Sequence, residues 1–149
     1  MTLGEYVSRF SKSLRRLRET KTERTVGVIN DTFAQVKRRI QTTGVDYEGS
    51  QYKGYSKIYK VERAGDGYQV NYFDMTRTGS LWNSINVFVE RDGRFNTIAV
   101  LKARDKNNDE KLRGNLGIRP NILRPSKTEL AFALKVWRER ALKELNNVR

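Results

Sequence analysis

The chain has 149 residues and carries 30 Lys or Arg against 17 Asp or Glu, a formal net charge of +13. It contains no histidine and no cysteine, which excludes Cys/His zinc sites, Ser-His-Asp triads, Cys-His dyads, imidazole acid–base catalysis and disulfides. The length suits a single domain, and the charge favours contact with polyanions. No apolar run approaches the ~20 residues of a membrane span, and the N-terminus has no secretory-signal pattern, so we expect a soluble chain without membrane contact.

Apolar residues at helical spacing form two stripes near the N-terminus. The first stripe comprises Leu3, Tyr6, Val7, Phe10, Leu14 and Leu17, and the second comprises Val26, Ile29, Phe33, Val36 and Ile40. The stripes are offset by about a third of a turn, and the polar run 20–25 lies where they change over. Either the helix breaks there, or one long helix faces two different partners. Gly44 occupies a helix-ending position, so we predict a helical region over residues 1–43.

Basic residues cluster in this helical region. They are Arg9, Lys12, Arg15 and Arg16 opposite the first stripe, and Lys37, Arg38 and Arg39 near the end of the second. Glu5 and Glu19 stand at pairing distance from the first group, which predicts a solvated helix face. The alternative is a surface turned towards DNA phosphates. The second group equally suits the negative end of a helix dipole.

The middle of the chain changes from helical to alternating patterns. Residues 44–67 predict a loop followed by a short helix at 55–63, and the alternation of Tyr68, Val70 and Tyr72 predicts a strand. Two further alternating runs between residues 85 and 103 meet at Asp92-Gly93, a dipeptide typical of the type I′ turn of a β-hairpin. Residues 78–84 have the pattern of a hydroxyl-capped helical turn that leads directly into this hairpin.

The last third combines a charged loop with a helix. Residues 104–125 predict a loop with a short helix at 108–113, closed by Gly114 or Gly117. Acidic residues from Asp105 onwards resemble the start of a calcium loop, but the required turn glycine and bidentate Glu are replaced. Ser126 and Glu129 form a capping box for a helix over 126–147. Its apolar stripe comprises Leu130, Leu134, Trp137, Ala141, Leu142, Leu145 and Val148.

These elements predict an α+β fold in a single domain, residues 1–149. We expect an antiparallel sheet of three to four strands over residues 68–103, built around the hairpin at 85–103. Long N-terminal and C-terminal helices would cover this sheet. We predict no catalytic, metal-binding or cofactor-binding residue.

Three segments resemble signature motifs of the tail-completion, neck or virion-morphogenesis proteins of tailed bacteriophages. The matching residues are Tyr55 and Tyr59, then Thr78, Gly79, Leu81, Ser84 and Ile85, then Arg119, Pro120, Leu123, Pro125 and Ser126. The motifs follow the family's order and the resemblance covers about residues 44–145. Asn121-Ile122 stand where the family often has an aromatic residue after Arg-Pro.

The resemblance implies a structural virion protein that forms a homo-oligomeric ring at the head–tail junction and catalyses no reaction. Its implied partners are further copies of itself, portal or adaptor proteins, tail proteins and the phage DNA that crosses the lumen without sequence readout. It would act in the virion after assembly in the host cytoplasm. A tail-terminator or a head-side adaptor of the same virion is the related alternative.

The composition also suggests two functions from other classes. The charge suits a basic nucleic-acid-binding module, although no helix-turn-helix, zinc finger or RRM signature is present. A metal-dependent nuclease would need clustered carboxylates, and the candidates lie in predicted turns or strand ends without a nuclease-type spacing. These candidates are Asp46, Glu48, Asp66, Asp74, Asp92, Asp105 and Asp109.

Overall fold

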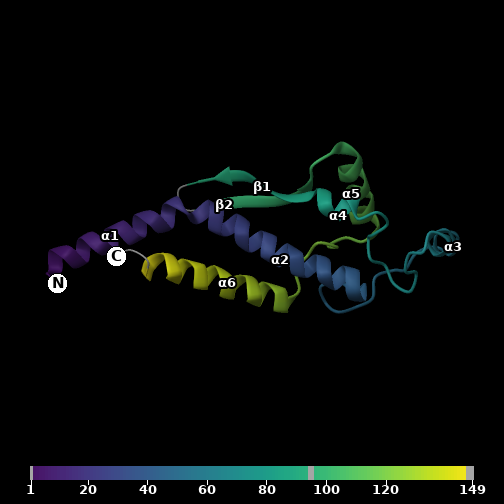
Figure 1. Ribbon diagram of the computed structural model, residues 1–149, viewed down its shortest axis with the longest axis horizontal. Helices are drawn as coiled ribbons and strands as arrows, with labels where there is room; N and C mark the ends of the chain where they lie inside the picture. Colours follow the sequence, from purple (N-terminus) through teal and green to yellow (C-terminus); the bar gives the residue numbers. More distant parts are fainter. Residues whose placement is uncertain (1, 94–95, 147–149) are drawn as a thin grey trace.

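A computed structural model describes residues 2–93 and 96–146, which form six helices and one two-stranded antiparallel sheet. The elements in chain order are α1 (Leu3–Glu19), α2 (Lys21–Thr43), α3 (Lys57–Gly65), α4 (Ser80–Ser84), β1 (Ile85–Asp92), β2 (Thr97–Ala103), α5 (Lys106–Ile118) and α6 (Lys127–Asn146). The fold therefore belongs to the α+β class. It is elongated, with α1 projecting at one end and α3 at the other (Figure 1).

The N-terminal helical region is two helices that meet at Thr20. This residue has φ −92° and ψ 3°, and its hydroxyl donates to the Arg16 carbonyl oxygen. Of the two arrangements considered from the sequence, the break is the one present. At the other end of α2, Gly44 adopts φ 63° and its N–H donates to the Ile40 carbonyl oxygen, as its helix-ending position predicts.

Helix α2 is the middle layer of the molecule. The hairpin β1–β2 packs on one side of α2, and α6 packs on another (Figure 1). We expected the sheet to lie against the long N-terminal and C-terminal helices. It packs against α2, the second part of the N-terminal helical region, and also against α4 and α5, whereas α6 lies on another side of α2. Ion pairs hold α6 to α2 instead: Arg39 with Glu129 at 3.0 Å, Arg24 with Glu144, and Arg140 with Asp31.

The hairpin has the alternation that the sequence predicts. Ile85, Val87 and Val89 pair with Ala103, Leu101 and Ala99 and share one face, which is buried at Ile85 and open to solvent at Val89, 41% exposed. Phe88, paired with Val100, lies on the other face, and alternation along β2 places Ile98 there as well. A bulge between Val89 and Arg91 makes Arg91 the partner of Ile98. The prediction of a type I′ turn at Asp92-Gly93 is wrong, because neither residue has the positive φ that this turn requires. The strands run on to Asp92 and restart at Thr97; residues 94–95 lie outside the described ranges.

The third strand expected at Tyr68–Tyr72 is absent from the sheet, which has two strands within the described residues. In this segment, side chains make the hydrogen bonds to the backbone that a neighbouring strand would otherwise make. The Gln69 amide accepts from the Asn71 and Tyr72 N–H groups and donates to the Tyr72 carbonyl, and Arg63 donates to the Gln69 carbonyl. Since local side chains satisfy this backbone, the alternation of aromatic residues does not produce a strand.

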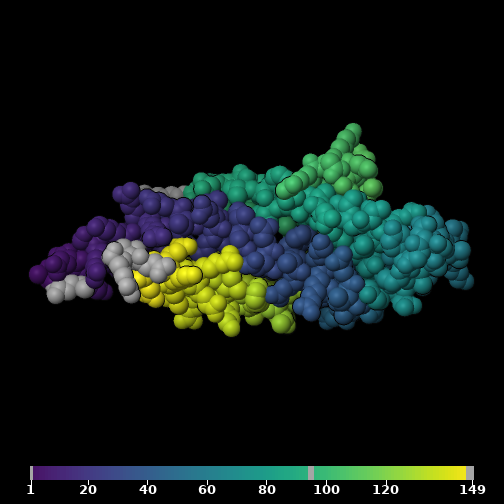
Figure 2. Space-filling view, viewed as in Figure 1, coloured from purple at the N-terminus to yellow at the C-terminus, as the bar shows by residue number. Residues whose placement is uncertain are grey.

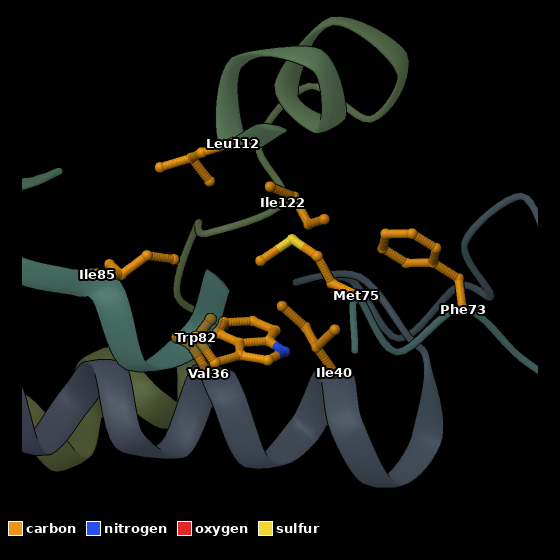
Figure 3. Close-up of a cluster of buried hydrophobic side chains, with 8 residues drawn as sticks. All are labelled: Val36, Ile40, Phe73, Met75, Trp82, Ile85, Leu112 and Ile122. Carbon is orange, nitrogen blue, oxygen red and sulfur yellow. The ribbon is translucent and has the colours of Figure 1, made fainter. Parts of the chain in front are cut away.

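The core is small and lies where α2, α4, α5 and the segment ahead of α4 meet (Figure 3). Its buried members are Val36, Ile40, Phe73, Met75, Trp82, Ile85, Leu112 and Ile122. Trp82 is only 2% exposed although it lies in a five-residue helix, and its ring stands 6.0 Å from that of Phe33. The core thus anchors α4 and the start of β1 onto α2.

The remaining helices are capped as their sequences indicate. Ser126 and Glu129 form the predicted capping box at α6. Asp105 caps α5, and the Asn108 N–H that it accepts lowers the pKa of its carboxyl. Helix α5 spans thirteen residues and continues through Gly114 and Gly117, which we expected to end a shorter helix. Neither glycine has a positive φ, so neither acts as a helix stop.

Candidate functional site

Two of the three resemblance motifs line one cavity. Tyr55, just ahead of α3, Tyr59 in its first turn, and Thr78, Gly79 and Leu81 from the turn into α4 border a space of about 390 Å³ that α5 also lines. The motif residues are separated by about twenty positions in the chain, and the fold brings them together. The cavity is therefore the place where the sequence motifs meet.

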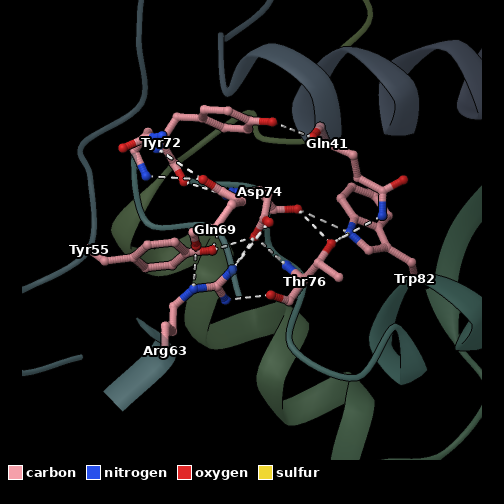
Figure 4. A network of polar contacts seen from close by, with 9 residues as sticks. Gln41, Tyr55, Arg63, Gln69, Tyr72, Asp74, Thr76 and Trp82 are labelled. Carbon is pink, nitrogen blue, oxygen red and sulfur yellow. Dashed lines mark hydrogen bonds and ion pairs between the residues drawn. The ribbon is translucent and has the colours of Figure 1, made fainter. Parts of the chain in front are cut away.

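A buried polar network supports one wall of this cavity (Figure 4). The Arg63 guanidinium, 1% exposed, lies 3.2 Å from both carboxylate oxygens of Asp74. The Tyr55 hydroxyl donates to the same carboxylate at 2.6 Å. Burial, together with this hydrogen bond to Asp74, raises the pKa of the Tyr55 phenol far above its ordinary value.

The network continues from Asp74 to helix α2. The Asp74 carboxylate accepts the Thr76 N–H, and the Trp82 indole donates to the Asp74 carbonyl and the Thr76 hydroxyl oxygens. The Gln41 side chain donates to the same hydroxyl, and the Tyr72 hydroxyl donates to the Gln41 carbonyl. Polar contacts thus tie α2, α3 and α4 to one irregular segment, which keeps the cavity wall fixed.

Two residues of the cavity lining have left-handed backbone conformations. Gly79 has φ 78°, a conformation that glycine adopts without steric cost, and it forms the N-cap of α4. Met75 has φ 55°, which is strained for a side chain of its size, and it is held by burial at 6% exposure. The chain therefore reverses direction at the Thr-Gly motif, and this reversal places Trp82 in the core.

Part of the cavity lining is rich in hydrogen-bond donors. Arg77, Lys111, Ser80 and Asn115 belong to it, and the lining drawn from residues 2–93 and 96–146 includes no Asp or Glu. Arg77 makes ion pairs with Glu62 at 2.7 Å and with Asp66 at 2.9 Å. These donors can bind an acceptor or an anion, but the lining supplies no carboxylate to act as a general base.

The third motif supports the same region from outside the cavity. The Arg119 guanidinium lies 3.6 Å from the centre of the Phe73 ring and donates to the Lys53 carbonyl at 2.7 Å. Burial lowers the pKa of Arg119. Ile122, which follows Pro120 by two residues, is fully buried in the core. Pro125 and Leu123 are half-buried beside it, and Ser126 caps α6.

The basic residues singled out from the sequence occupy different environments. Arg9, Lys12, Arg16 and Arg38 are exposed and have no ion-pair partner among the described residues, whereas Arg15 pairs with Glu19 at 2.8 Å. Arg39 forms its ion pair with Glu129 at 14% and 7% side-chain exposure, so it fastens α6 to α2. Lys37 lies 6.0 Å from the Trp82 ring. Of the seven basic residues singled out, those that are exposed without an ion-pair partner among the described residues are three on α1 and Arg38 on α2.

The stripe on α6 points away from the core. Leu130, Leu134 and Trp137 are 50%, 71% and 44% exposed, and we call these three residues the α6 face. The side of α6 that meets α2 is the one bearing Glu129, Arg140 and Glu144. The helical spacing predicts this stripe but not its direction, because an amphipathic pattern does not indicate which element covers it.

Two further apolar surfaces are open to solvent. The hairpin face consists of Phe88 and Ile98, 40% and 44% exposed, with half-buried Val100 between them. The α1 stripe consists of Leu3, Tyr6, Val7, Phe10 and Leu14, all at least 40% exposed. Figure 2 shows α1 extending beyond the body and part of the surface of α6 facing the viewer.

The carboxylates weighed for a nuclease are dispersed. Asp74 pairs with Arg63, Asp92 with Lys21 and Asp109 with Arg113. Across the described part of the chain, no group of three or more potential metal-ligating side chains comes together. Within the same residues, no helix has the length and apolar character to cross a bilayer.

Comparisons of this chain with protein-family models, with curated proteins and with solved structures give no match. Function must therefore be argued from the residues themselves.

Proposed function

We propose that this chain is a non-catalytic structural subunit that assembles head to tail into a ring, as neck and tail-completion proteins of tailed bacteriophages do. The observation that carries the proposal is the pair of unlike apolar surfaces on the two outer layers. The hairpin face lies on the outside of β1–β2, on one side of α2, and the α6 face lies on another side, where Arg24 of α2 stands 5.4 Å from the centre of the Trp137 ring.

Two unlike faces favour a ring over a two-fold dimer. A two-fold interface uses the same patch on both subunits, so one apolar face suffices for it. A head-to-tail interface joins two different patches of each subunit, and it closes into a ring when the rotation between subunits permits. The layered order of hairpin, α2 and α6 can repeat from copy to copy, with each hairpin face on the next α6 face.

The dimensions of the two elements that bear these faces agree. Helix α6 has 20 residues, about 30 Å at 1.5 Å per residue. Strand β1 has eight residues, about 27 Å at ~3.4 Å per residue. The hairpin of one copy can therefore lie along α6 of the next. The bulge after Val89 also twists the hairpin, which favours an angle between successive copies over flat stacking.

The motif residues suit a scaffold more than a reaction centre. Gly79 reverses the chain, Ser126 caps a helix, and Arg119 and Tyr55 brace the core through Phe73 and Asp74. Each role is geometric, and each fixes the position of the hairpin or of α6 relative to α2. The motifs would thus hold the two assembly faces at a constant angle.

The free cations of α1 suit passing DNA. Arg9, Lys12 and Arg16 are exposed and unpaired within the described residues, and phosphate contacts by such side chains carry no sequence information. A ring at a head–tail junction, with portal, adaptor or tail proteins on its two rims, is the setting we propose for the chain. A tail-terminator or head-side adaptor would use the same faces.

Size-exclusion chromatography with light scattering, followed by negative-stain microscopy, tests the proposal. We expect the wild-type chain to form closed rings as its concentration rises, and Leu134→Asp and Phe88→Asp each to yield 17.4 kDa monomers. Val61→Asp is the matched control, because Val61 is 75% exposed on α3, outside both faces. A wild-type chain that remains monomeric at about 1 mM, where even weak contacts of about −4 kcal/mol populate complexes, overturns the proposal.

A nucleic-acid-binding module is the second candidate, and the unpaired α1 cations favour it. It differs in needing no oligomer. Salt-dependent DNA binding by the monomeric Leu134→Asp variant, equal to that of the wild-type chain, would support this candidate over the ring.

A further inference from the structure

Helix α1 has a surface that the ring does not use. Residues 2–12 are all exposed, so the first three turns of α1 extend from the body without packing against it (Figure 1). The helix is nevertheless well formed at its start, because Thr2 and Glu5 make a reciprocal capping box. An isolated helical segment this short is marginal in water, so its persistence favours a role in contact with something else.

The α1 stripe has the spacing of a docking helix. Its members stand at positions i, i+3, i+4, i+7 and i+11, beginning with Leu3, which is 80% exposed. The Tyr6 and Phe10 rings lie parallel with their centres 6.5 Å apart and form a continuous aromatic ridge. Helices with this spacing insert their anchors into apolar grooves of other proteins.

The charges beside the stripe are positive. Arg9 lies one turn from Tyr6 on one border, and Arg18 lies one turn from Leu14 on the other. Neither arginine makes an ion pair within the described residues, whereas Glu5 is engaged in the capping box and Glu19 pairs with Arg15. The groove that complements this helix therefore has acidic borders.

Within the described residues, neither the α6 face nor a second α1 stripe offers such a groove. The α6 face is bordered by the exposed cations Lys127 and Arg138, so an α1 docked there would bring like charges together. Two α1 helices packed stripe to stripe would likewise oppose their arginines. With a net charge of +13, the chain complements an acidic partner better than a second copy.

A protein groove also fits the stripe better than a lipid surface does. The same side of α1 leads into buried Ser13 and half-buried Leu17, where α1 packs against α6. The stripe therefore ends in the angle between α1 and α6. The ridge or groove wall of a partner protein can enter this angle, whereas a flat bilayer would contact α6 before it reached the whole stripe.

We propose that α1 is a docking helix for a different protein, one that presents an apolar groove bordered by Asp and Glu side chains. Tyr6 and Phe10 are the central anchors, and Arg9 and Arg18 pair with the acidic borders. This inference does not rest on the ring, because it uses neither the α6 face nor the hairpin face.

Fluorescence anisotropy with the full chain and two labelled synthetic peptides tests the proposal. One peptide is a leucine-heptad helix with Glu at the positions beside its apolar seam, and the other has Lys there. We expect the Glu peptide to bind at least about tenfold more tightly than the Lys peptide. Tyr6→Ser/Phe10→Ser should lose this binding, and Val61→Ser, on α3, should retain it. Arg9→Glu/Arg18→Glu should weaken the Glu peptide about tenfold and reverse the preference.

Three results would overturn the proposal. They are equal binding of both peptides, capture of the chain by phosphatidylserine vesicles in place of the Glu peptide, and self-association that Tyr6→Ser/Phe10→Ser abolishes. Ring formation is measured separately through Leu134→Asp, so failure of the docking helix leaves the ring proposal standing, and the reverse also holds.

Discussion

The guanidinium of Arg63 lies 3.2 Å from both oxygens of the Asp74 carboxylate, and both side chains are nearly removed from solvent. The pair joins α3 to the segment that leads into α4. Tyr55 donates to the same carboxylate at 2.6 Å, so one buried acid fixes two elements that the sequence keeps nineteen residues apart. The pair thus helps to fix the segment from which α4 and the hairpin follow.

Loss of the Asp74 charge should destabilise the chain strongly. Asp74→Asn keeps the shape of the side chain but leaves the buried Arg63 guanidinium without a counter-charge, which costs about 3–5 kcal/mol. Urea-induced unfolding followed by circular dichroism measures the change. Glu62→Gln is the control, because it removes only the exposed ion pair to Arg77 and should have a far smaller effect. Similar losses in the two variants would contradict the role given to Asp74.

Stability should fall at alkaline pH, and Tyr55 should contribute to the fall. Its pKa is raised in the folded chain above the ordinary value of about 10, so unfolding above that pH releases a proton. Its contribution is complete below pH 10 and is lost as pH rises beyond it. Unfolding free energies at pH 9, 10 and 11 should therefore decline less steeply for Tyr55→Phe than for the wild-type chain. Parallel declines would show that Tyr55 does not titrate on unfolding.

Gly44 should not tolerate a side chain. At φ 63°, an alanine would carry about 1–2 kcal/mol of backbone strain, and its Cβ would lie 2.7 Å from the Cβ of Tyr72. We expect Gly44→Ala to lower the unfolding free energy by at least that strain. Gly54→Ala is the matched control, since Gly54 is exposed and a Cβ there meets no atom within 4 Å. An unchanged free energy in Gly44→Ala would be inconsistent with the left-handed helix end.

Local sequence patterns predicted local structure well. Gly44 as a helix end, the Ser126 capping box and the alternating faces of the hairpin all depend on residues close in the chain, and the structure contains each of them. The prediction of a third strand was wrong for a physical reason. Alternation at Tyr68–Tyr72 resembles a strand, but Gln69 and Arg63 satisfy that backbone through side chains.

Contacts between distant residues could not be predicted in the same way. Nothing in the spacing of the α6 stripe indicates that Leu134 points outward, because the direction depends on ion pairs from Arg24 and Arg39. The cavity was also missed as a whole, although five of its residues belong to the motifs. Arg63 and Asp74 are ordinary charged residues in the sequence, and only burial reveals their role.

Duplex DNA binding should depend on the unpaired α1 cations. We expect Arg9→Gln/Lys12→Gln/Arg16→Gln to reduce the slope of log affinity against log salt by about 3, at roughly 0.9 per phosphate contact. Anisotropy of a labelled duplex at several salt concentrations measures the slope. Lys106→Gln/Arg113→Gln on α5 is the control, because those cations already have acidic partners. A slope that falls equally in both variants would place the DNA contacts elsewhere.

The central claim is that the hairpin face of one copy meets the α6 face of the next, and mixing two variants tests it most directly. Leu134→Asp keeps an intact hairpin face and Phe88→Asp keeps an intact α6 face, so each alone should stay monomeric. Light scattering of an equimolar mixture should show a dimer of twice the 17.4 kDa chain mass and nothing larger. A mixture that remains monomeric, or a single variant that still forms rings, would contradict head-to-tail assembly through these faces.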